Sequence, residues 1–283
     1  MVGYRIHGGL GNQIFQILTA LRVSTDYKTR INLDFSNLSE RDSHVDFWMN
    51  QLSRFEYITI SAPTKFKLEH RELRHISELG TRLKVDKKSD FDFHGWQPEI
   101  CVFEDSNLIR RGHFLFDMTK TEIYPMKRAA IHLRRGDYLV SPNLGLVTNN
   151  YLGKALHRVI DKGVRNFTVF SDDLNFAREW AESSASKSIR FEVFEEKSAV
   201  NALSEMSKYS LIITSNSTFS FWASYFSGGF SYVPFPFYNN VPRFDRNLHV
   251  SKHFSRHIID TPRLIPAYIS YLRQSLVNML GRS

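Results

Sequence analysis

AAIHLRRGDY, at residues 129–138, is an apolar strand pattern that ends in a charged turn. After it, short apolar runs typical of buried strands alternate with stretches whose apolar residues recur at helical spacing. The predicted strands are residues 129–133, 167–171, 190–194, 211–214 and 230–234, and the predicted helices are residues 151–162, 174–183, 200–208 and 217–226. This alternation predicts an α/β fold with a doubly wound parallel sheet, in which ligands bind at the carboxyl ends of the strands.

The N-terminal segment begins with a similar pattern. Residues 2–7 predict a short strand, residues 8–13 a tight glycine-rich turn, and the apolar positions 14, 17, 18 and 21 the start of a helix. Residues 31–34 predict a second strand, which closes a βαβ unit with a right-handed crossover. Between residues 35 and 120 the pattern predicts no defined elements.

The polar stretch at residues 117–127, which contains Pro125, is the predicted domain boundary. We therefore expect two Rossmann-like domains, an N-terminal one at residues 1–120 and a C-terminal one at residues 121–283. A final helix at residues 262–280 carries an apolar stripe that predicts packing back across both domains.

The composition is that of a globular protein, with 42% hydrophobic and 14% aromatic residues. Lys and Arg outnumber Asp and Glu by 37 to 29, and this formal charge of +8 favours an anionic partner such as a nucleotide, a nucleic acid or a membrane surface. The one cysteine, Cys101, cannot form an intramolecular disulfide, and the sequence shows neither an export signal nor a run of about 18 apolar residues. These features predict a cytoplasmic protein.

Two arginines follow the first strand of the alternating region. The strand's end delivers Arg134 and Arg135 to the edge where ligands bind, and their planar guanidinium groups suit a pyrophosphate. The alternative is a solvated arginine pair beside Asp137. His132 shares one side of the strand with Arg134.

Two further polar clusters follow predicted strands. Asp172 and Asp173 could accept hydrogen bonds from a guanine base or a ribose, or could cap the next helix, and an adjacent Asp pair alone is a weak metal signal. Asn216, Ser217 and Thr218 stand where a helix N-terminus favours an anion, and the alternative there is again a capping segment.

The glycine turn matches neither the Walker pattern nor a complete Gly-x-Gly-x-x-Gly fingerprint. Gly9 and Gly11 would let a ligand approach the backbone closely, and Asn12 could present its amide to that ligand.

Together these motifs resemble the α-1,2-fucosyltransferases of glycosyltransferase family 11. Four family motifs occur here in family order, at residues 8–16 (GGLGNQIFQ), 132–138 (HLRRGDY), 171–173 (SDD) and 216–220 (NSTFS). The resemblance implies a GT-B architecture, two Rossmann-like domains with a cleft between them, and inverting transfer of L-fucose from GDP-fucose to a galactoside without a required metal.

The resemblance also implies roles for single residues. Arg134 would bind the β-phosphate and Arg135 would support the loop, whereas His132 and Asp172 or Asp173 would face the nucleoside. Ser217 and Thr218 would contact phosphate, and Asn12 the fucose or the acceptor. No acidic residue lies between Asp137 and Asp161, so the catalytic base is unassigned, with Asp137 as the nearest candidate or else a structural partner of Arg135.

Two other interpretations stay open at this point. The donor could be another GDP-deoxysugar such as GDP-colitose, because the motifs contact GDP and not the sugar. A nucleic-acid-binding module would fit the charge, but no helix-turn-helix, zinc or RNP signature is present.

The acceptor is expected to be a galactose-containing, lipid-linked glycan at the inner membrane face. The basic residues proposed for a peripheral contact with anionic lipid are Arg246, Lys252, Arg256, Arg263, Arg273 and Arg282.

Overall fold

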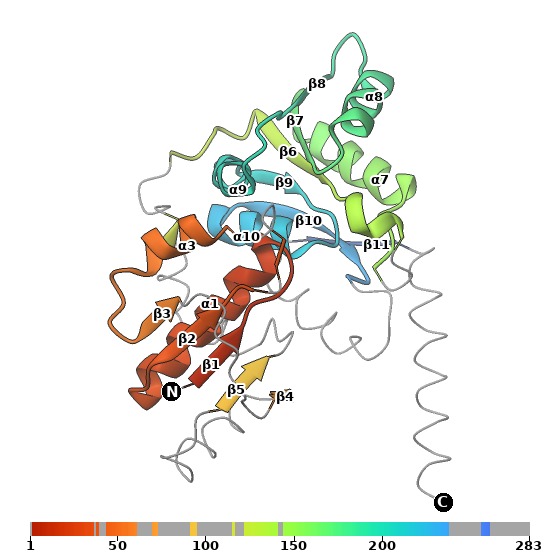
Figure 1. The fold of residues 1–283 in the computed structure, drawn as a ribbon. Helices are drawn as coiled ribbons and strands as arrows, with labels where there is room; N and C mark the ends of the chain where they lie inside the picture. Colours follow the sequence, from red (N-terminus) through yellow and green to blue (C-terminus); the bar gives the residue numbers. More distant parts are fainter. Residues whose placement is uncertain are drawn as a thin grey trace, which may run out of the picture. The chain divides into compact units, whose positions relative to one another are not determined.

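The computed structural model describes residues 2–36, 38–39, 44–60, 70–72, 91–94, 115–116, 122–140, 144–237 and 256–260. The chain divides into two compact units, Met1–Lys120 and Thr121–Ser283 (Figure 1). The predicted final helix and all the basic residues proposed for membrane contact except Arg256 lie outside the described residues.

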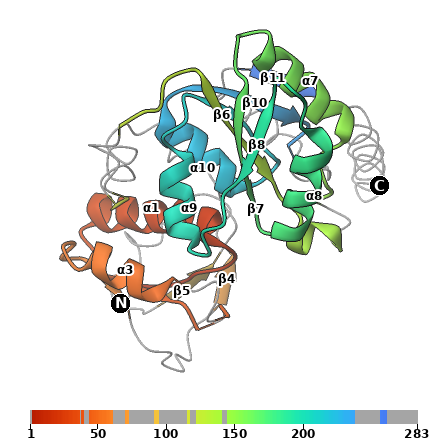
Figure 2. The same cartoon turned by 90° about the horizontal axis from the view of Figure 1, so that it is seen from above.

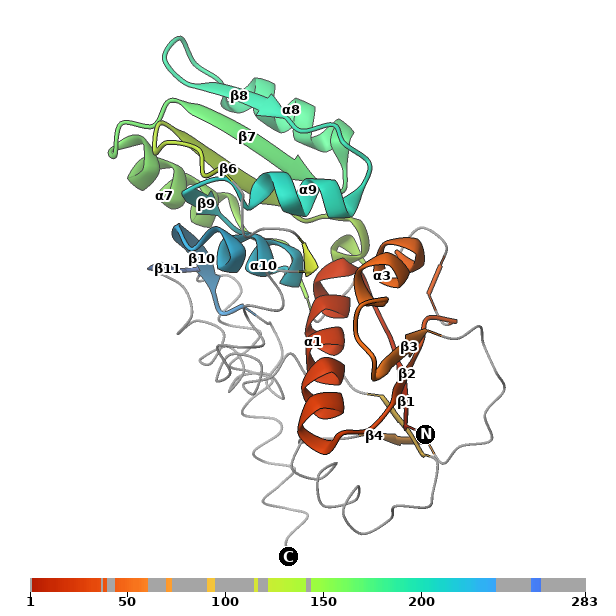
Figure 3. The same ribbon diagram turned by 90° about the vertical axis from the view of Figure 1, so that its left-hand side faces the viewer.

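The first unit contains a five-stranded parallel sheet in the order β3-β2-β1-β5-β4. Its described elements are β1 (Val2–Arg5), α1 (Leu10–Tyr27), β2 (Ile31–Asp34), α3 (Val45–Leu52), β3 (Ile58–Ile60), β4 (His70–Glu72) and β5 (Phe91–His94). The long helix α1 runs beside strands β1 and β2 (Figure 3). Four of these elements, from α3 to β5, are ones that the sequence did not predict.

The predicted glycine turn is shorter than expected. Helix α1 begins at Leu10, so Gly11, Asn12 and Gln13 belong to its first turn and only Gly8 and Gly9 form the connection. Gly8 has a positive φ of 73°, which favours glycine, and the backbone amide of Asn12 donates to the carbonyl of Gly9 at 2.9 Å.

The second unit contains a six-stranded parallel sheet in the order β11-β10-β9-β6-β7-β8. Its described helices and strands are β6 (Arg128–Leu133), α7 (Asn149–Ile160), β7 (Asn166–Ser171), α8 (Leu174–Ser184), β8 (Arg190–Val193), α9 (Ala199–Met206), β9 (Leu211–Ile213), α10 (Thr218–Ser227), β10 (Phe230–Phe235) and β11 (Arg256–Ile259). The nine α-helices and β-strands from β6 to β10 lie where the sequence predicts them, within one or two residues at each end, whereas β11 and the 3₁₀ turn at Gly136–Leu139 are additional.

Helices cover both faces of this sheet. Helices α7 and α8 lie on one face and α9 and α10 on the other (Figure 2). The core under α7 and α8 contains Tyr151 and Val159 from α7, packed with Ile131, Phe167 and other apolar strand residues. Burial of these apolar side chains is the main term that stabilises the unit. The helices on both faces confirm the doubly wound arrangement predicted from the alternation.

Candidate functional site

The strand order of the second sheet reverses between β6 and β9. Strands are added outward from β6 through β7 and β8 on one side, and from β9 through β10 and β11 on the other. Ligands of doubly wound sheets bind at such a reversal, beyond the carboxyl ends of the strands. The two segments that leave the sheet there carry the predicted site residues Arg134 and Arg135 after β6, and Asn216 and Ser217 after β9.

His132 ties these two strand ends together inside the protein. Its Nδ1 lies 2.7 Å from Ser215 Oγ, and its ring packs 5.2 Å from that of Phe219. Burial, and then the charge of Arg134, lowers the pKa of His132 from 6.5 to about 3. The imidazole is therefore neutral, and its shown contacts are with protein groups; the contact with a nucleoside stays a prediction.

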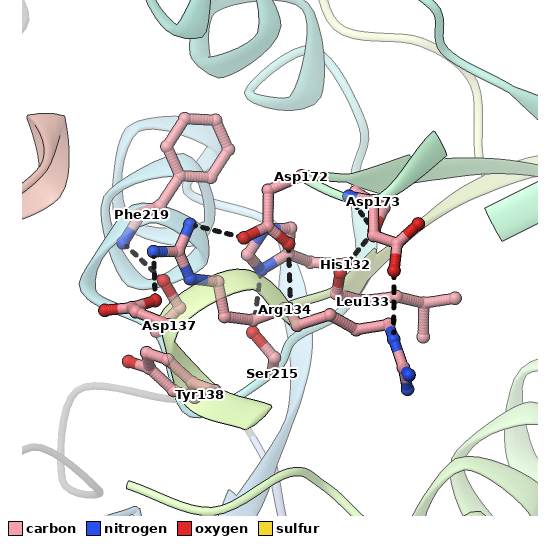
Figure 4. Close-up of polar contacts among 12 residues, drawn as sticks. His132, Leu133, Arg134, Asp137, Tyr138, Asp172, Asp173, Ser215 and Phe219 are labelled. Carbon is pink, nitrogen blue, oxygen red and sulfur yellow. Dashed lines mark hydrogen bonds and ion pairs between the residues drawn. The ribbon is translucent and has the colours of Figure 1, made fainter. Parts of the chain in front are cut away.

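Arg134 lies between two carboxylates (Figure 4). Its guanidinium is 3.0 Å from Asp172 Oδ2 and 2.6 Å from Asp137 Oδ1, and it stands over the ring of Tyr138 at 5.3 Å. Burial lowers the pKa of Arg134, but the charges of Asp172 and Asp137 outweigh that effect and raise it. The guanidinium is thus a fixed, permanent charge at the carboxyl end of β6.

Asp172 connects the guanidinium to the backbone of the turn. Its Oδ1 accepts a hydrogen bond from the Arg135 amide at 2.9 Å, while its Oδ2 faces Arg134. A Cβ atom on Gly136 would lie 2.3 Å from the same Oδ2. Only glycine at position 136 leaves room for the carboxylate where it stands.

Arg135 points to a different partner set. Its Nε donates to Asp173 Oδ2 at 3.3 Å, and its guanidinium lies over the ring of Phe176 at 3.7 Å. Asp173 also caps α8, because its Oδ1 accepts from the Phe176 amide at 3.0 Å. The two arginines therefore do not act as one pair.

The structure contradicts one alternative for Asp137. The sequence offered it as a possible structural partner of Arg135, but its carboxylate pairs with Arg134. A 3₁₀ turn at Gly136–Leu139 brings position 137 back toward the residue three positions before it, which the sequence pattern did not reveal.

The segment after β9 is buried and bonded to its surroundings. Ser217 caps α10 by accepting from the Phe219 amide at 3.2 Å, and Thr218 is the first residue of that helix. The Asn216 side chain donates to the carbonyls of Leu144 and Gly145 at 2.8 and 3.1 Å. Ser217 is therefore a helix cap, which was one of the two interpretations of this segment. A capped helix N-terminus can still bind an anion.

Gly9, Gly11 and Asn12 belong to the first unit, and their predicted contacts with donor or acceptor stay predictions. Two glutamines of the same motif form hydrogen bonds that stabilise the local structure. Gln16 both donates to the His7 carbonyl and accepts from the His7 amide, at 2.8 and 2.9 Å. Gln13 accepts from Trp48 Nε1 at 2.8 Å and donates to the Gly8 carbonyl at 2.8 Å, so the motif holds the connection between β1 and α1.

The described part of the chain contains neither a cluster of metal ligands nor a membrane-spanning helix. Among the residues that the structure describes, no group of three or more His, Cys, Asp or Glu side chains could hold a metal ion. The same residues include no helix that is long and apolar enough to cross a membrane.

Comparison with known proteins identifies the segment that carries this site. The family model described as Glycosyl transferase family 11 matches residues 115–240. Over this segment the chain is similar to glycosyltransferase family 11. The matched segment contains Arg134, Arg135, Asp137, the two aspartates after β7 and the segment after β9, which are the parts that the strand reversal brings together.

Two curated relatives from Escherichia coli are similar to most of the chain. The O-antigen biosynthesis glycosyltransferase WbnK is 27% identical over 275 residues, covering 78% of this chain and 88% of the relative. An alpha-1,2-colitosyltransferase is 25% identical over 265 residues, covering 83% of this chain and 91% of the relative.

The solved structure of POFUT1 in complex with GDP has a similar fold. Its TM-score is 0.52 at 11% identity, with 92% of this chain and 98% of the other covered. This likeness shows the fold alone, and with the two parallel sheets it confirms the α/β GT-B class predicted from the sequence.

The neutral state of His132 predicts a pH-dependent stability of the second unit. As the pH falls below 6.5 an unfolded chain takes up a proton at this position, but the folded protein does so only near pH 3, so the stability falls with the pH across that window. His132→Asn keeps a hydrogen-bonding group toward Ser215 and does not titrate. Urea unfolding at pH 7 and 5.5 should show that the wild type loses about 1 kcal/mol more than this variant. Equal losses of stability in the two proteins would show that the pKa of His132 is not lowered in the folded state.

Proposed function

We propose that this glycosyltransferase moves L-fucose from GDP-fucose onto a galactoside hydroxyl, in α-1,2 linkage and with inversion, during surface-glycan synthesis. The observation that carries the proposal is Arg134, a permanent charge held at the point where the strand order reverses. The O-antigen relative and the GDP bound to the structural neighbour support the pathway and the donor nucleotide.

The contacts of Arg134 suggest how it receives a diphosphate. Its Nε is buried and has no hydrogen-bond acceptor within the described residues. The Asp137 side chain is 60% exposed. An ion pair with so much exposure to water typically contributes only about 0–1 kcal/mol to stability. A diphosphate can therefore replace Asp137 on the guanidinium, whereas the less exposed Asp172 stays and keeps the group oriented.

The chemical step follows from this placement. The acceptor oxygen attacks the anomeric carbon from the side opposite GDP, and the bond from that carbon to the β-phosphate oxygen breaks. Arg134 and the N-terminus of α10 stabilise the charge that develops on GDP. Asp137, displaced from Arg134, is the nearest carboxylate that can take the proton of the acceptor hydroxyl.

A second donor has a specific observation in its favour. One curated relative is named as an alpha-1,2-colitosyltransferase, at nearly the same identity as the O-antigen relative. Arg134 and the N-terminus of α10 would bind the GDP part, which fucose and colitose donors share, so GDP-colitose is the alternative donor with the same mechanism.

A donor competition assay tests the function. The protein is incubated with GDP-fucose, GDP-colitose and a panel of galactose-terminated acceptors, and the consumption of each donor and the linkage in the product are measured. Consumption of GDP-fucose with a new α-1,2 linkage supports the proposal. If GDP-colitose is consumed faster than GDP-fucose, colitose is the transferred sugar and the proposed mechanism stays the same. If neither donor is consumed, the proposed function is wrong.

We expect full activity in excess EDTA. Arg134 and the helix N-terminus would supply the charge compensation that a divalent cation supplies in other transferases, and Asp172 and Asp173 are already engaged by arginines. The measurement is the transfer rate after dialysis against EDTA, with and without added Mn²⁺. Complete loss that Mn²⁺ restores would contradict the expectation and turn the two aspartates into metal ligands.

The remaining partners are part of the same proposal. The acceptor is a galactose-containing, lipid-linked glycan, and the protein acts in the cytoplasm with peripheral contact to anionic lipid through its basic residues. Nucleic acid is not a proposed partner.

A further inference from the structure

The side chain of Arg135 forms a flat surface that the transfer mechanism does not use. Its Cζ lies 3.7 Å from the centre of the Phe176 ring, a distance at which the guanidinium packs closely against the ring face. Its Nε donates to Asp173 Oδ2, which fixes the edge of the group. Both supporting residues come from the first turn of α8, where Asp173 is the cap, so the surface rests on a rigid element.

This surface has one face that Phe176 does not cover. The guanidinium plane has two faces and the ring packs against one, while the side chain as a whole stays 23% exposed. A guanidinium is weakly hydrated, and its plane is a common stacking partner for nucleobases.

The position of the surface matches the nucleotide end of a donor. Arg135 follows Arg134 directly, and Asp172 binds both the Arg134 guanidinium and the Arg135 amide. Arg135 packs on Phe176 of α8, the helix after β7, so it turns toward the β7 side of the strand reversal. Arg134 stands over Tyr138, whose hydroxyl donates to the Asn216 carbonyl after β9, so Arg134 stays at the reversal itself. A nucleoside diphosphate whose phosphates bind Arg134 can extend its base toward Arg135.

We infer that Arg135, backed by Phe176 and held by Asp173, is the stacking platform for the purine base of the donor nucleotide. This inference rests on the proposed function and deepens it. It gives Arg135 a direct contact with the ligand, in place of the loop-supporting role that the family resemblance implied.

Arg135→Lys separates stacking from charge, because lysine keeps the cation and loses the plane. Isothermal titration measures binding of GDP and of ribose 5-diphosphate, which has the phosphates and the sugar but no base. We expect Arg135→Lys to weaken GDP binding about tenfold, or about 1.4 kcal/mol, and to change ribose 5-diphosphate binding less than twofold. Phe176→Leu should weaken GDP binding in the same selective way, by a smaller factor.

The matched control is Arg178→Lys on the same helix. Arg178 pairs with Glu195 at 2.9 Å on the exposed side of α8, so this variant should bind GDP as the wild type does. If Arg135→Lys weakens binding of both ligands equally, or of neither, Arg135 is not a stacking platform for the base. Failure of the wild type to bind GDP at all is a different result, which removes the proposed function itself.

Discussion

Arg134→Ala is expected to abolish measurable glycosyl transfer while the protein stays folded. The side chain lies at the strand reversal with its charge fixed by Asp172 and Asp137, and these exposed or half-buried contacts are not part of the apolar core. Loss of a preorganised donor to developing charge typically costs about 3 kcal/mol, or roughly a hundredfold or more in rate. Arg134→Lys should also be poor, because an ammonium cannot bind the diphosphate and Asp172 with a planar fork.

The measurement for Arg134→Ala is kcat/KM for the donor, together with the thermal unfolding midpoint. A variant that keeps more than about a tenth of the wild-type kcat/KM would limit the contribution of Arg134 to less than about 1.4 kcal/mol. That outcome is incompatible with stabilisation of the leaving group by this residue.

Gly136→Ala is expected to remove most activity through a single added methyl group. Its Cβ would lie 2.3 Å from Asp172 Oδ2, so the carboxylate must move away from both Arg134 and the Arg135 amide. The chain can still fold, because the displaced atom is the end of a side chain. We expect a loss of more than tenfold in kcat/KM and weaker GDP binding, with the loss in kcat/KM measured by donor titration.

The matched control for this variant is Gly153→Ala on helix α7. A Cβ at Gly153 meets nothing within 4 Å, and alanine is the better helix former, so activity should be unchanged and stability equal or higher. If Gly136→Ala turns over the donor as well as Gly153→Ala does, the position of Asp172 is not important for the reaction.

The sequence predicted the second unit well because four of its strands, β6, β7, β9 and β10, are mostly buried. Buried parallel strands are continuous apolar runs, and the helices between them have clear helical spacing, as in the strand at Asn166–Ser171 and the helix that follows it. In the first unit the strands at Ile58–Ile60 and His70–Glu72 are only three residues long, and the pattern in so short a segment is too weak to separate a strand from a loop.

The sequence predicted which side chains gather at the strand ends, but not the contacts that they make. Strand ends placed Arg134, Asp172 and Ser217 at one edge of the sheet, and the strand order agrees with that placement. Which carboxylate each arginine takes depends on the 3₁₀ turn after Arg135 and on the approach of Gly136 to Asp172. Phe176 gave no signal in the sequence, since an aromatic residue in the first turn of an amphipathic helix is most simply a core residue.

The most direct test of the account is a crystal structure of the protein with GDP. We predict that the β-phosphate binds the Arg134 guanidinium beside the N-terminus of α10, that Asp172 keeps its contact with Arg134, and that Asp137 no longer pairs with it. GDP bound away from the strand reversal, with the pair between Arg134 and Asp137 intact, would contradict the central claim that Arg134 is the diphosphate site.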